Sequence, residues 1–241
     1  MKKMLFLLVA IQLFLSAQSQ QTVSLSKAEK EGLLYMQEEE KLARDVYDSM
    51  FAKWEVNPFG NIRQSERVHM DRMNTLAVTY GIKEEKVFKN DKPGGFLDPL
   101  LASYYKALIA SGSISLTDAL KAGAKIEELD IADLDKRIAQ TNKEDILTAY
   151  RFLRMGSENH LRAFTRRLKS QGVDYQPEFI KKEMFDAIIS GENQEAGCGN
   201  GPGNGQGQGR GQGQGKGNGP GNGACKEKCC DKEAGTGNKS N

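Results

Sequence analysis

The chain has 241 residues, and its 34 basic and 32 acidic residues give a formal net charge of +2. This balance excludes nucleic-acid binding driven by a large positive field, so we expect no nucleic-acid partner. The composition is uneven, because glycine dominates residues 192–241 and no aromatic residue occurs there. We therefore expect residues 20–191 to hold the hydrophobic core, a length that suits one domain.

The N-terminus predicts an export signal. A short basic segment, Met1–Lys3, precedes the apolar run Met4–Leu15, and Ala17 and Ser19 are the small residues of a cleavage site. The alternative is an uncleaved N-terminal anchor. We predict that residues 1–19 form a signal peptide and that the protein is periplasmic or secreted. No later segment has the apolar run of about 18 residues that a membrane span needs, so we expect no transmembrane span in the mature protein.

Within the C-terminal stretch, residues 192–241, the segment 199–223 alternates glycine with Asn, Gln, Pro, Arg or Lys. Such a composition buries too little apolar surface to offset its ordering entropy, which predicts a disordered tail. This tail contains all four cysteines, namely Cys198, Cys225, Cys229 and Cys230. Their even number in an exported chain favours disulfides, and soft-metal capture is the alternative.

Between these ends the sequence shows only helical patterns. Apolar residues recur every three or four positions between capping signals, and no segment alternates as a strand does. In chain order, the predicted helices run from about Ser26 to Asn57, Asn61 to Tyr80, Asp98 to Gly112, Ser115 to Ala139, Thr141 to Gln171 and Pro177 to Ile189.

Four of these helices are long, and short connections join them into two antiparallel hairpins. The link between the hairpins is long and contains the short helix that begins at Asp98. A single long crossover is typical of ferritin-like bundles, whereas an up-and-down bundle does not need one. The sequence therefore predicts an all-α, ferritin-like four-helix bundle with one long crossover, a short crossover helix and a short C-terminal helix.

The second long helix carries charged residues on its apolar stripe. Glu66 and His69 share one face with Ile62, Met73 and Leu76. Burying a carboxylate and an imidazole together is unfavourable without a partner, and a divalent metal supplies that partner. The alternative is a buried Glu–His hydrogen bond, which this motif alone would favour.

The other long helices add potential ligands. His160 lies on the stripe of the last long helix, Glu127 lies on that of the third, and Asp130 is one turn away. The first long helix carries the acidic run Glu38–Glu40 beside its apolar residues. Carboxylates and imidazoles from four helices match the metal site that carboxylate proteins build in a bundle core.

Several motifs resemble those of rubrerythrins and related ferritin-like proteins. The segment Glu40–Tyr47 resembles their first-helix ligand segment, in which the Glu binds iron and a Tyr two turns later hydrogen-bonds near it. This resemblance selects Glu40, whereas the helical period alone favours Glu39. The pair Glu66-x-x-His69 resembles their second-helix motif, and residues 126–130 resemble the third.

The stretch from about Ser26 to Ser170 also resembles the domain of unknown function family 2202, a ferritin-like branch. The strings that carry this resemblance are EEEKLARDVY (38–47), SERVHM (65–70) and GSENHLRAF (156–164). The resemblance implies that the metal ligands are Glu40, Glu66, His69, Glu127, Asp130 and His160, with Tyr47 and Ser157 beside them.

One residue departs from the ferritin-like pattern. Ser157 lies three residues before His160, where the resemblance implies a bridging Glu, and Asp130 could replace it only in part. The site therefore holds two metals asymmetrically, holds one, or is vestigial. Its carboxylates suit iron or manganese, and its imidazoles are compatible with iron or zinc.

Two functional classes remain open. The first is a redox enzyme with one or two irons, or manganese, that uses oxygen or peroxide as a partner. The second is a non-catalytic metal-binding or interaction module. The sequence leaves the native metal, the substrate and the oligomeric state undetermined.

Overall fold

The computed structural model describes residues 24–82 and 91–191. The predicted signal peptide and the Cys-containing tail lie outside these described residues. The described parts of the chain contain helices and no strand, which confirms the all-α prediction. The helices are α1 (Lys27–Trp54), α2 (Phe59–Thr79), α4 (Pro99–Gly112), α5 (Leu116–Ile138), α6 (Glu144–Lys169) and α7 (Lys182–Ser190).

The chain falls into two compact units, Met1–Lys182 and Glu183–Asn241. The first unit holds the helical bundle. The second contains nearly all of α7, in which Phe185 and Ile188 are buried. None of the helices in the described segments is both long and apolar enough to cross a membrane.

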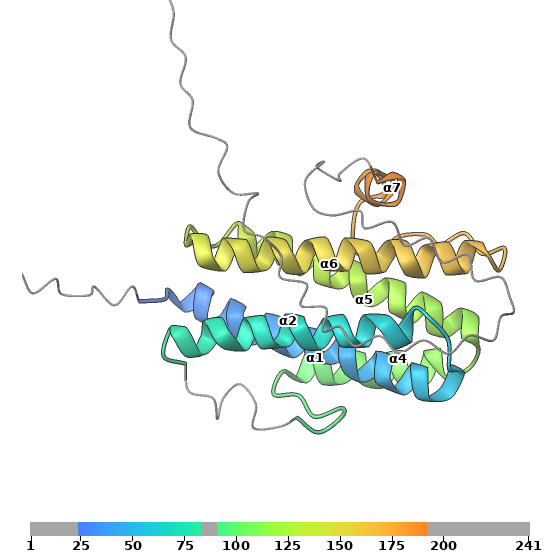
Figure 1. The fold of residues 1–241 in the computed structure, drawn as a ribbon, viewed down its shortest axis with the longest axis horizontal. Helices are drawn as coiled ribbons and strands as arrows, with labels where there is room; N and C mark the ends of the chain where they lie inside the picture. The colour runs from blue at the N-terminus through green and yellow to red at the C-terminus, as the bar shows by residue number, and fades with distance from the viewer. Residues whose placement is uncertain (1–23, 83–90, 192–241) are drawn as a thin grey trace, which may run out of the picture. The chain divides into compact units, whose positions relative to one another are not determined.

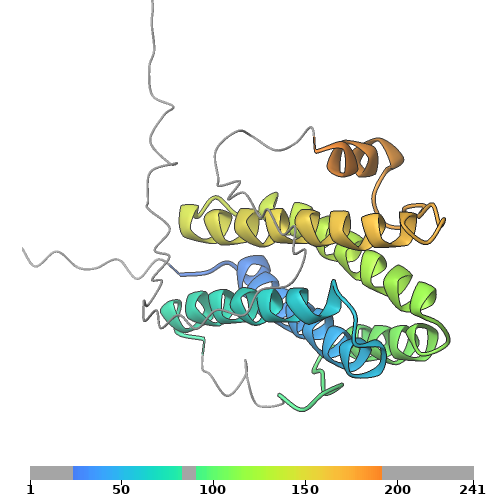
Figure 2. The same ribbon diagram turned by 45° about the vertical axis from the view of Figure 1, so that its right-hand side comes forward.

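Four long helices form the bundle of the first unit. Helix α1 packs against α2 and α5, and α6 packs against α5 and α2, while the shorter α4 lies against α1 and α5. Figures 1 and 2 show α2 and α6 running side by side, with α1 and α5 behind them. Each long helix thus has two long neighbours, and its inward face is shielded from solvent.

Local capping signals start three of the helices where the sequence predicts. Ser26 and Glu29 form the predicted capping box of α1, because each side chain accepts the other residue's backbone N–H. The side chains of Asp98 and Ser115 cap α4 and α5 in the same way, by accepting N–H groups of the first turn.

The predicted capping box at Thr141 is wrong. Helix α6 begins at Glu144, and no side chain caps its first residue. The hydroxyl of Thr141 instead donates to Glu29 Oε1 at 2.7 Å and so ties the start of α1 to the loop before α6. The Thr141 oxygen also accepts the backbone N–H of Lys143 at 3.2 Å, so it stabilises the turn before α6 and not the first turn of the helix.

The prediction that the last helix starts at Pro177 is also wrong, because α7 begins at Lys182. The reason is the fully buried carboxylate of Glu128 on α5. Its Oε2 accepts the backbone N–H groups of residues 178–180 at 2.8, 3.0 and 3.3 Å, and its Oε1 accepts the Tyr175 hydroxyl at 2.5 Å. These bonds anchor residues 178–180 to α5 in a non-helical conformation, and the helix begins only after them.

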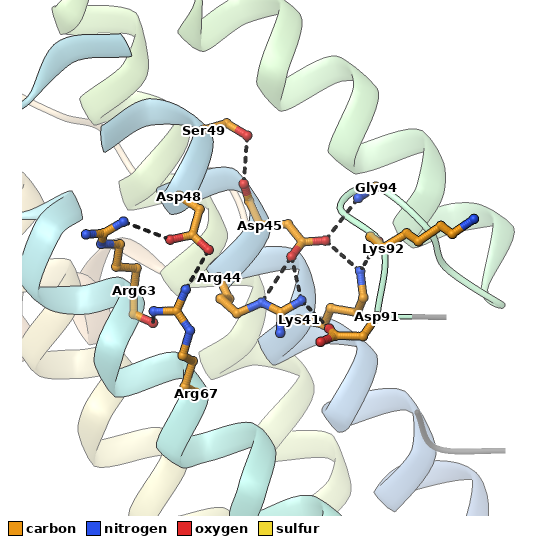
Figure 3. A network of polar contacts seen from close by, with 10 residues as sticks. All are labelled: Lys41, Arg44, Asp45, Asp48, Ser49, Arg63, Arg67, Asp91, Lys92 and Gly94. Atoms are coloured by element: carbon orange, nitrogen blue, oxygen red, sulfur yellow. Dashed lines mark hydrogen bonds and ion pairs between the residues drawn. The ribbon is translucent and has the colours of Figure 1, made fainter. Parts of the chain in front are cut away.

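A polar network holds residues 91–94 of the crossover against α1 (Figure 3). The buried carboxylate of Asp45 accepts hydrogen bonds from Lys41 at 2.6 Å, from Arg44 at 2.7 Å and from the Gly94 backbone at 3.0 Å. Arg44 also pairs with Asp91 at 2.6 Å. Because both of its partners belong to this network, Arg44 serves the crossover and not the Glu–His cluster.

Two apolar clusters fill the bundle on either side of its middle. One is the aromatic group Tyr47, Phe59 and Phe164, whose ring centroids lie 5.3–6.0 Å apart. The other lies nearer the opposite end of the bundle and draws on all four long helices; it includes Leu33, Met36, Met73, Leu134, Ile146, Tyr150 and Leu153. On α1, α2 and α6 the candidate ligands fall between these two clusters, so the site has apolar packing on both sides.

Candidate metal centre

Polar side chains from all four long helices meet at the middle of the bundle. Each of them is at most 8% exposed. Helix α1 contributes Glu40, α2 contributes Glu66 and His69, α5 contributes Glu127 and Asp130, and α6 contributes Ser157 and His160.

Glu66 lies at the centre of this cluster. Its Oε2 is 2.9 Å from His69 Nδ1, and its Oε1 is 2.9 Å from His160 Nδ1. A second carboxylate faces each imidazole: Glu40 Oε2 is 3.1 Å from His69 Nδ1, and Glu127 Oε2 is 3.4 Å from His160 Nδ1. The two rings stack with centroids 5.7 Å apart. The two oxygens of Glu66 thus face different histidines.

These distances fit two adjacent metal positions. Two donor atoms that each lie about 2.1 Å from a metal, about 90–110° apart, are about 3.0–3.4 Å from one another. The ligand atoms of Glu40, Glu66 and His69 all lie within 4.8 Å of one another, and so do those of Glu66, Glu127 and His160. Glu66 belongs to both groups, as a bridging carboxylate would.

Unsatisfied buried atoms support a cation-binding arrangement. Glu40 Oε1 has no hydrogen-bond partner, and the 2.9 Å contact between His160 Nδ1 and Glu66 Oε1 is an ion pair only when the imidazole is protonated. Buried polar atoms are usually paired, because leaving them unpaired is unfavourable. A shared metal requires donor atoms that are adjacent without being directed at each other, and these residues fit that requirement.

The pKa values of the side chains in the cluster also differ from their ordinary values. Burial opposes ionisation of Glu66, but His160 and His69 hold its pKa well below the usual value. Burial would lower the pKa of both histidines, yet the facing carboxylates raise it to about 11 for His69 and about 10 for His160. Burial raises the pKa of Glu40 well above its usual value, and Asp130 adds to this rise. In the metal-free protein, protons thus occupy positions that a divalent cation would take.

Tyr47 supports one of the ligands. Its hydroxyl donates to Glu127 Oε1 at 2.5 Å, and Tyr47 is fully buried. Because this bond holds one oxygen of Glu127, the other oxygen is directed towards His160. The sequence resemblance implies a hydrogen bond of Tyr47 near Glu40, whereas the structure places this bond at Glu127 of α5.

Asp130 and Ser157 lie beside the two ligand groups and belong to neither. The Ser157 hydroxyl hydrogen-bonds to Asp130 Oδ2 and lies 3.0 Å from the Leu153 carbonyl oxygen. Burial raises the pKa of Asp130 to about 7, although the bond to Ser157 works against that rise. Oδ2 of Asp130 thus pairs with the Ser157 hydroxyl, and Oδ1 of Asp130 has no hydrogen-bond partner.

Gly156 and Glu39 were not among the predicted site residues. A Cβ at Gly156 would lie 2.6 Å from His69 Cε1, so only glycine lets this imidazole pack against α6. No sequence signal marks that contact. Glu39 is 1% exposed and neither of its oxygens has a partner. The helical period, which favours Glu39 over Glu40, already indicated that the Glu39 side chain faces inward. In the structure both residues are buried.

The fold and this site define a class: a helical-bundle protein with a buried cluster of carboxylates and histidines shared by four helices. Residues 29–192 match the family described as Uncharacterized protein domain (DUF2202), and the chain belongs to that family.

A curated relative and a solved structure agree with this assignment. Over 170 residues the chain is 48% identical to Uncharacterized protein MJ0754 of Methanocaldococcus jannaschii, which covers 70% of this chain and 91% of the relative. The crystal structure of hypothetical protein MJ0754 from Methanococcus jannaschii superimposes with a TM-score of 0.67 at 49% identity, covering 69% of this chain and 94% of that chain.

Proposed function

We propose that this protein is a ferritin-like metalloprotein that binds two iron or manganese ions in its bundle core. The observation that carries the proposal is the position of Glu66, whose two oxygens each lie 2.9 Å from a different histidine Nδ1. In this proposal His69 and Glu40 complete one metal position, His160 and Glu127 complete the other, and Glu66 bridges them.

The donor set favours hard and borderline metals. Carboxylate oxygens suit manganese and iron, imidazole nitrogens suit iron, and the cluster contains no thiolate that would favour a softer metal. Bound metals of this kind supply the means to bind and reduce oxygen or peroxide. The chain's own residues hold the ligands: Tyr47 orients Glu127, and Gly156 lets His69 reach its two carboxylates.

One observation favours a second candidate function, a metal-binding module that does not catalyse a reaction. Ser157 occupies the position at which a fourth-helix carboxylate would bridge the two metals, and it hydrogen-bonds to Asp130. A hydroxyl is uncharged and shorter than a glutamate side chain, so it binds a hard cation poorly. We therefore expect metal binding with slow peroxide consumption.

The proposed location of the protein is outside the cytoplasm. Residues 1–19 combine a basic start, an apolar run and small residues at a cleavage site. Sequencing the N-terminus of protein recovered from the periplasm or the medium tests this proposal. A first residue near Gln20 supports export, and an intact Met1 in a cytoplasmic fraction contradicts it.

Metal analysis tests the proposed function. Full-length protein purified without added metal is loaded with Mn²⁺ or Fe²⁺ under argon, desalted and analysed by mass spectrometry. We expect two ions per chain in the wild type and a loss of at least one ion in Glu66→Gln. Asp71→Asn, which removes an exposed carboxylate from the same helix, is the matched control. Absence of bound metal in the wild type, or full loading of Glu66→Gln, would contradict the proposal.

A further inference from the structure

A row of carboxylates follows the seam between α1 and α5. Glu127, Asp130 and Asp133 are three residues apart on α5, so they share one face and each step rises by about 4.5 Å along the helix. Glu127 lies in the candidate metal centre. At the other end of the row, the side chain of Asp133 is 10% exposed. The row thus runs from the centre of the bundle towards the exposed side chain of Lys136, and Asp133 itself is 7% exposed.

Glu39 lies level with the middle of this row. Two tyrosines of α1 fix the alignment, because the Tyr35 hydroxyl donates to Asp133 Oδ2 at 3.2 Å and the Tyr47 hydroxyl donates to Glu127 Oε1 at 2.5 Å. The two helices are therefore antiparallel, and a residue one turn after Tyr35 faces the level of Asp130. Glu39 is that residue, and the charges of Asp130 and Asp133 join burial in raising its pKa.

The middle of the row lacks the partners that buried carboxylates normally have. Glu39 is 1% exposed, and both of its oxygens have no hydrogen-bond partner. Asp130 is 5% exposed, and its Oδ1 has none. Such groups destabilise a fold unless they bind something at least transiently. Neither residue belongs to the two ligand groups, so metal ligation at the centre leaves them unexplained.

We propose that Glu39, Asp130 and Asp133 form a transit path along which divalent cations move from the surface to the two-metal centre. The inference rests on the proposed function. Carboxylate oxygens replace the water ligands of a hard cation, and an axial rise of about 4.5 Å between successive acidic positions of α5 suits a stepwise transfer from one carboxylate to the next. At the outer end, Asp133 Oδ1 pairs with Lys136 Nζ at 2.7 Å, and the Lys136 side chain is 69% exposed and free to swing into solvent.

The rate of metal loading tests this path. Metal-free full-length protein is mixed with Mn²⁺, samples are quenched with EDTA at increasing times, and the protein is desalted for metal analysis. We expect Glu39→Gln and Asp133→Asn to load at least about tenfold more slowly than the wild type. Each substitution removes a carboxylate that can exchange its proton or its partner for the passing cation, and acidic clusters speed cation entry by about that much or more. The final number of ions per chain should stay unchanged.

Glu38→Gln is the matched control, because it removes one carboxylate from the same acidic run but off the path. Glu38 accepts the backbone N–H groups of Leu97 and Asp98, and a glutamine can still accept one of them. We expect this variant to load at the wild-type rate. Thermal unfolding verifies that each variant folds. If Glu39→Gln does not fold, Asp133→Asn still tests the path, because Asp133 lies at its less buried end.

Three outcomes would overturn the path. A wild-type loading rate in both path variants would show that these carboxylates do not carry the ion. A lower final stoichiometry in Glu39→Gln would make this residue a resident ligand instead. No uptake by the wild type would refute the proposed function and the path with it, whereas normal wild-type uptake confines the failure to the path.

Discussion

Replacing Gly156 by alanine should weaken one metal position while leaving the other intact. A Cβ at this position would lie 2.6 Å from His69 Cε1 and 2.7 Å from His69 Nε2. Ordinary contacts between such atoms are about 3.5–4.0 Å, so the imidazole must retreat by roughly 1 Å. The ring has little room, because Phe152 packs edge-on against it with centroids 5.6 Å apart.

The expected magnitude follows from this displacement. Overpacking a core typically destabilises the fold by about 1–3 kcal/mol. Metal sites tolerate ligand errors of only about 0.2 Å, so a shift of this size in His69 Nδ1 misdirects a ligand. We expect the affinity of the position that contains Glu40 and His69 to fall at least about tenfold, equivalent to about 1.4 kcal/mol. The position that contains His160 should keep its affinity.

Gly32→Ala is the matched control. Its Cβ would lie 2.9 Å from the Tyr150 hydroxyl and 3.2 Å from Arg137 Cδ, so it also crowds the bundle, but away from the ligand groups. Mn²⁺ titrations monitored by the free-ion EPR signal measure both affinities, and urea unfolding of the metal-free proteins measures stability. If Gly156→Ala binds both ions as the wild type does, the account of how His69 is positioned is wrong.

Three further predictions concern pH, the C-terminal segment and the missing carboxylate. Both buried histidines have raised pKa values, and burial also raises that of Glu40, so each bound ion displaces at least one proton. We therefore expect the apparent Mn²⁺ affinity of each position to rise at least about tenfold per pH unit between about pH 6 and 8; titrations at constant ionic strength would show no such slope if the ligands carried no protons. Glu128→Ala should lower the free energy of unfolding by about 2–3 kcal/mol and speed amide exchange at residues 178–180, without changing metal content; unchanged exchange would contradict the anchoring role. The double variant Asp130→Ala, Ser157→Glu moves the carboxylate to the fourth helix and should raise peroxide consumption per bound ion, and rapid consumption by the wild type would show that Ser157 does not limit turnover.

Helix boundaries could be predicted where the deciding contact is local. The caps at Ser26, Asp98 and Ser115 use side chains within three residues of the helix start, so the sequence contains all the information. The signal at Thr141 has the same form, but its hydroxyl bonds to a residue far away in the sequence. Pro177 marks a typical helix start, yet the N–H groups after it bond to α5. Such tertiary partners override a local signal and leave no trace in it.

Helical periodicity placed most of the candidate site on the inward faces. It puts Glu66 and His69 on one stripe of α2, and the structure brings both together with the stripe residues of α5 and α6. Periodicity resolves a face only to about one residue, so it could not divide roles between Glu39 and Glu40, which are both buried. That division depends on the antiparallel alignment of α1 with α5. The role of Gly156 depends on a contact between α6 and α2, which no pattern within α6 encodes.

The most direct test of the two-metal account is anomalous diffraction from crystals of the full-length protein soaked in Mn²⁺. The account predicts two anomalous peaks in the bundle core, about 3.5–4 Å apart, with one oxygen of Glu66 directed at each peak. Glu40 and His69 should contact one peak, and Glu127 and His160 should contact the other. A core without anomalous density at saturating Mn²⁺, or a peak that Glu66 does not touch, would contradict it.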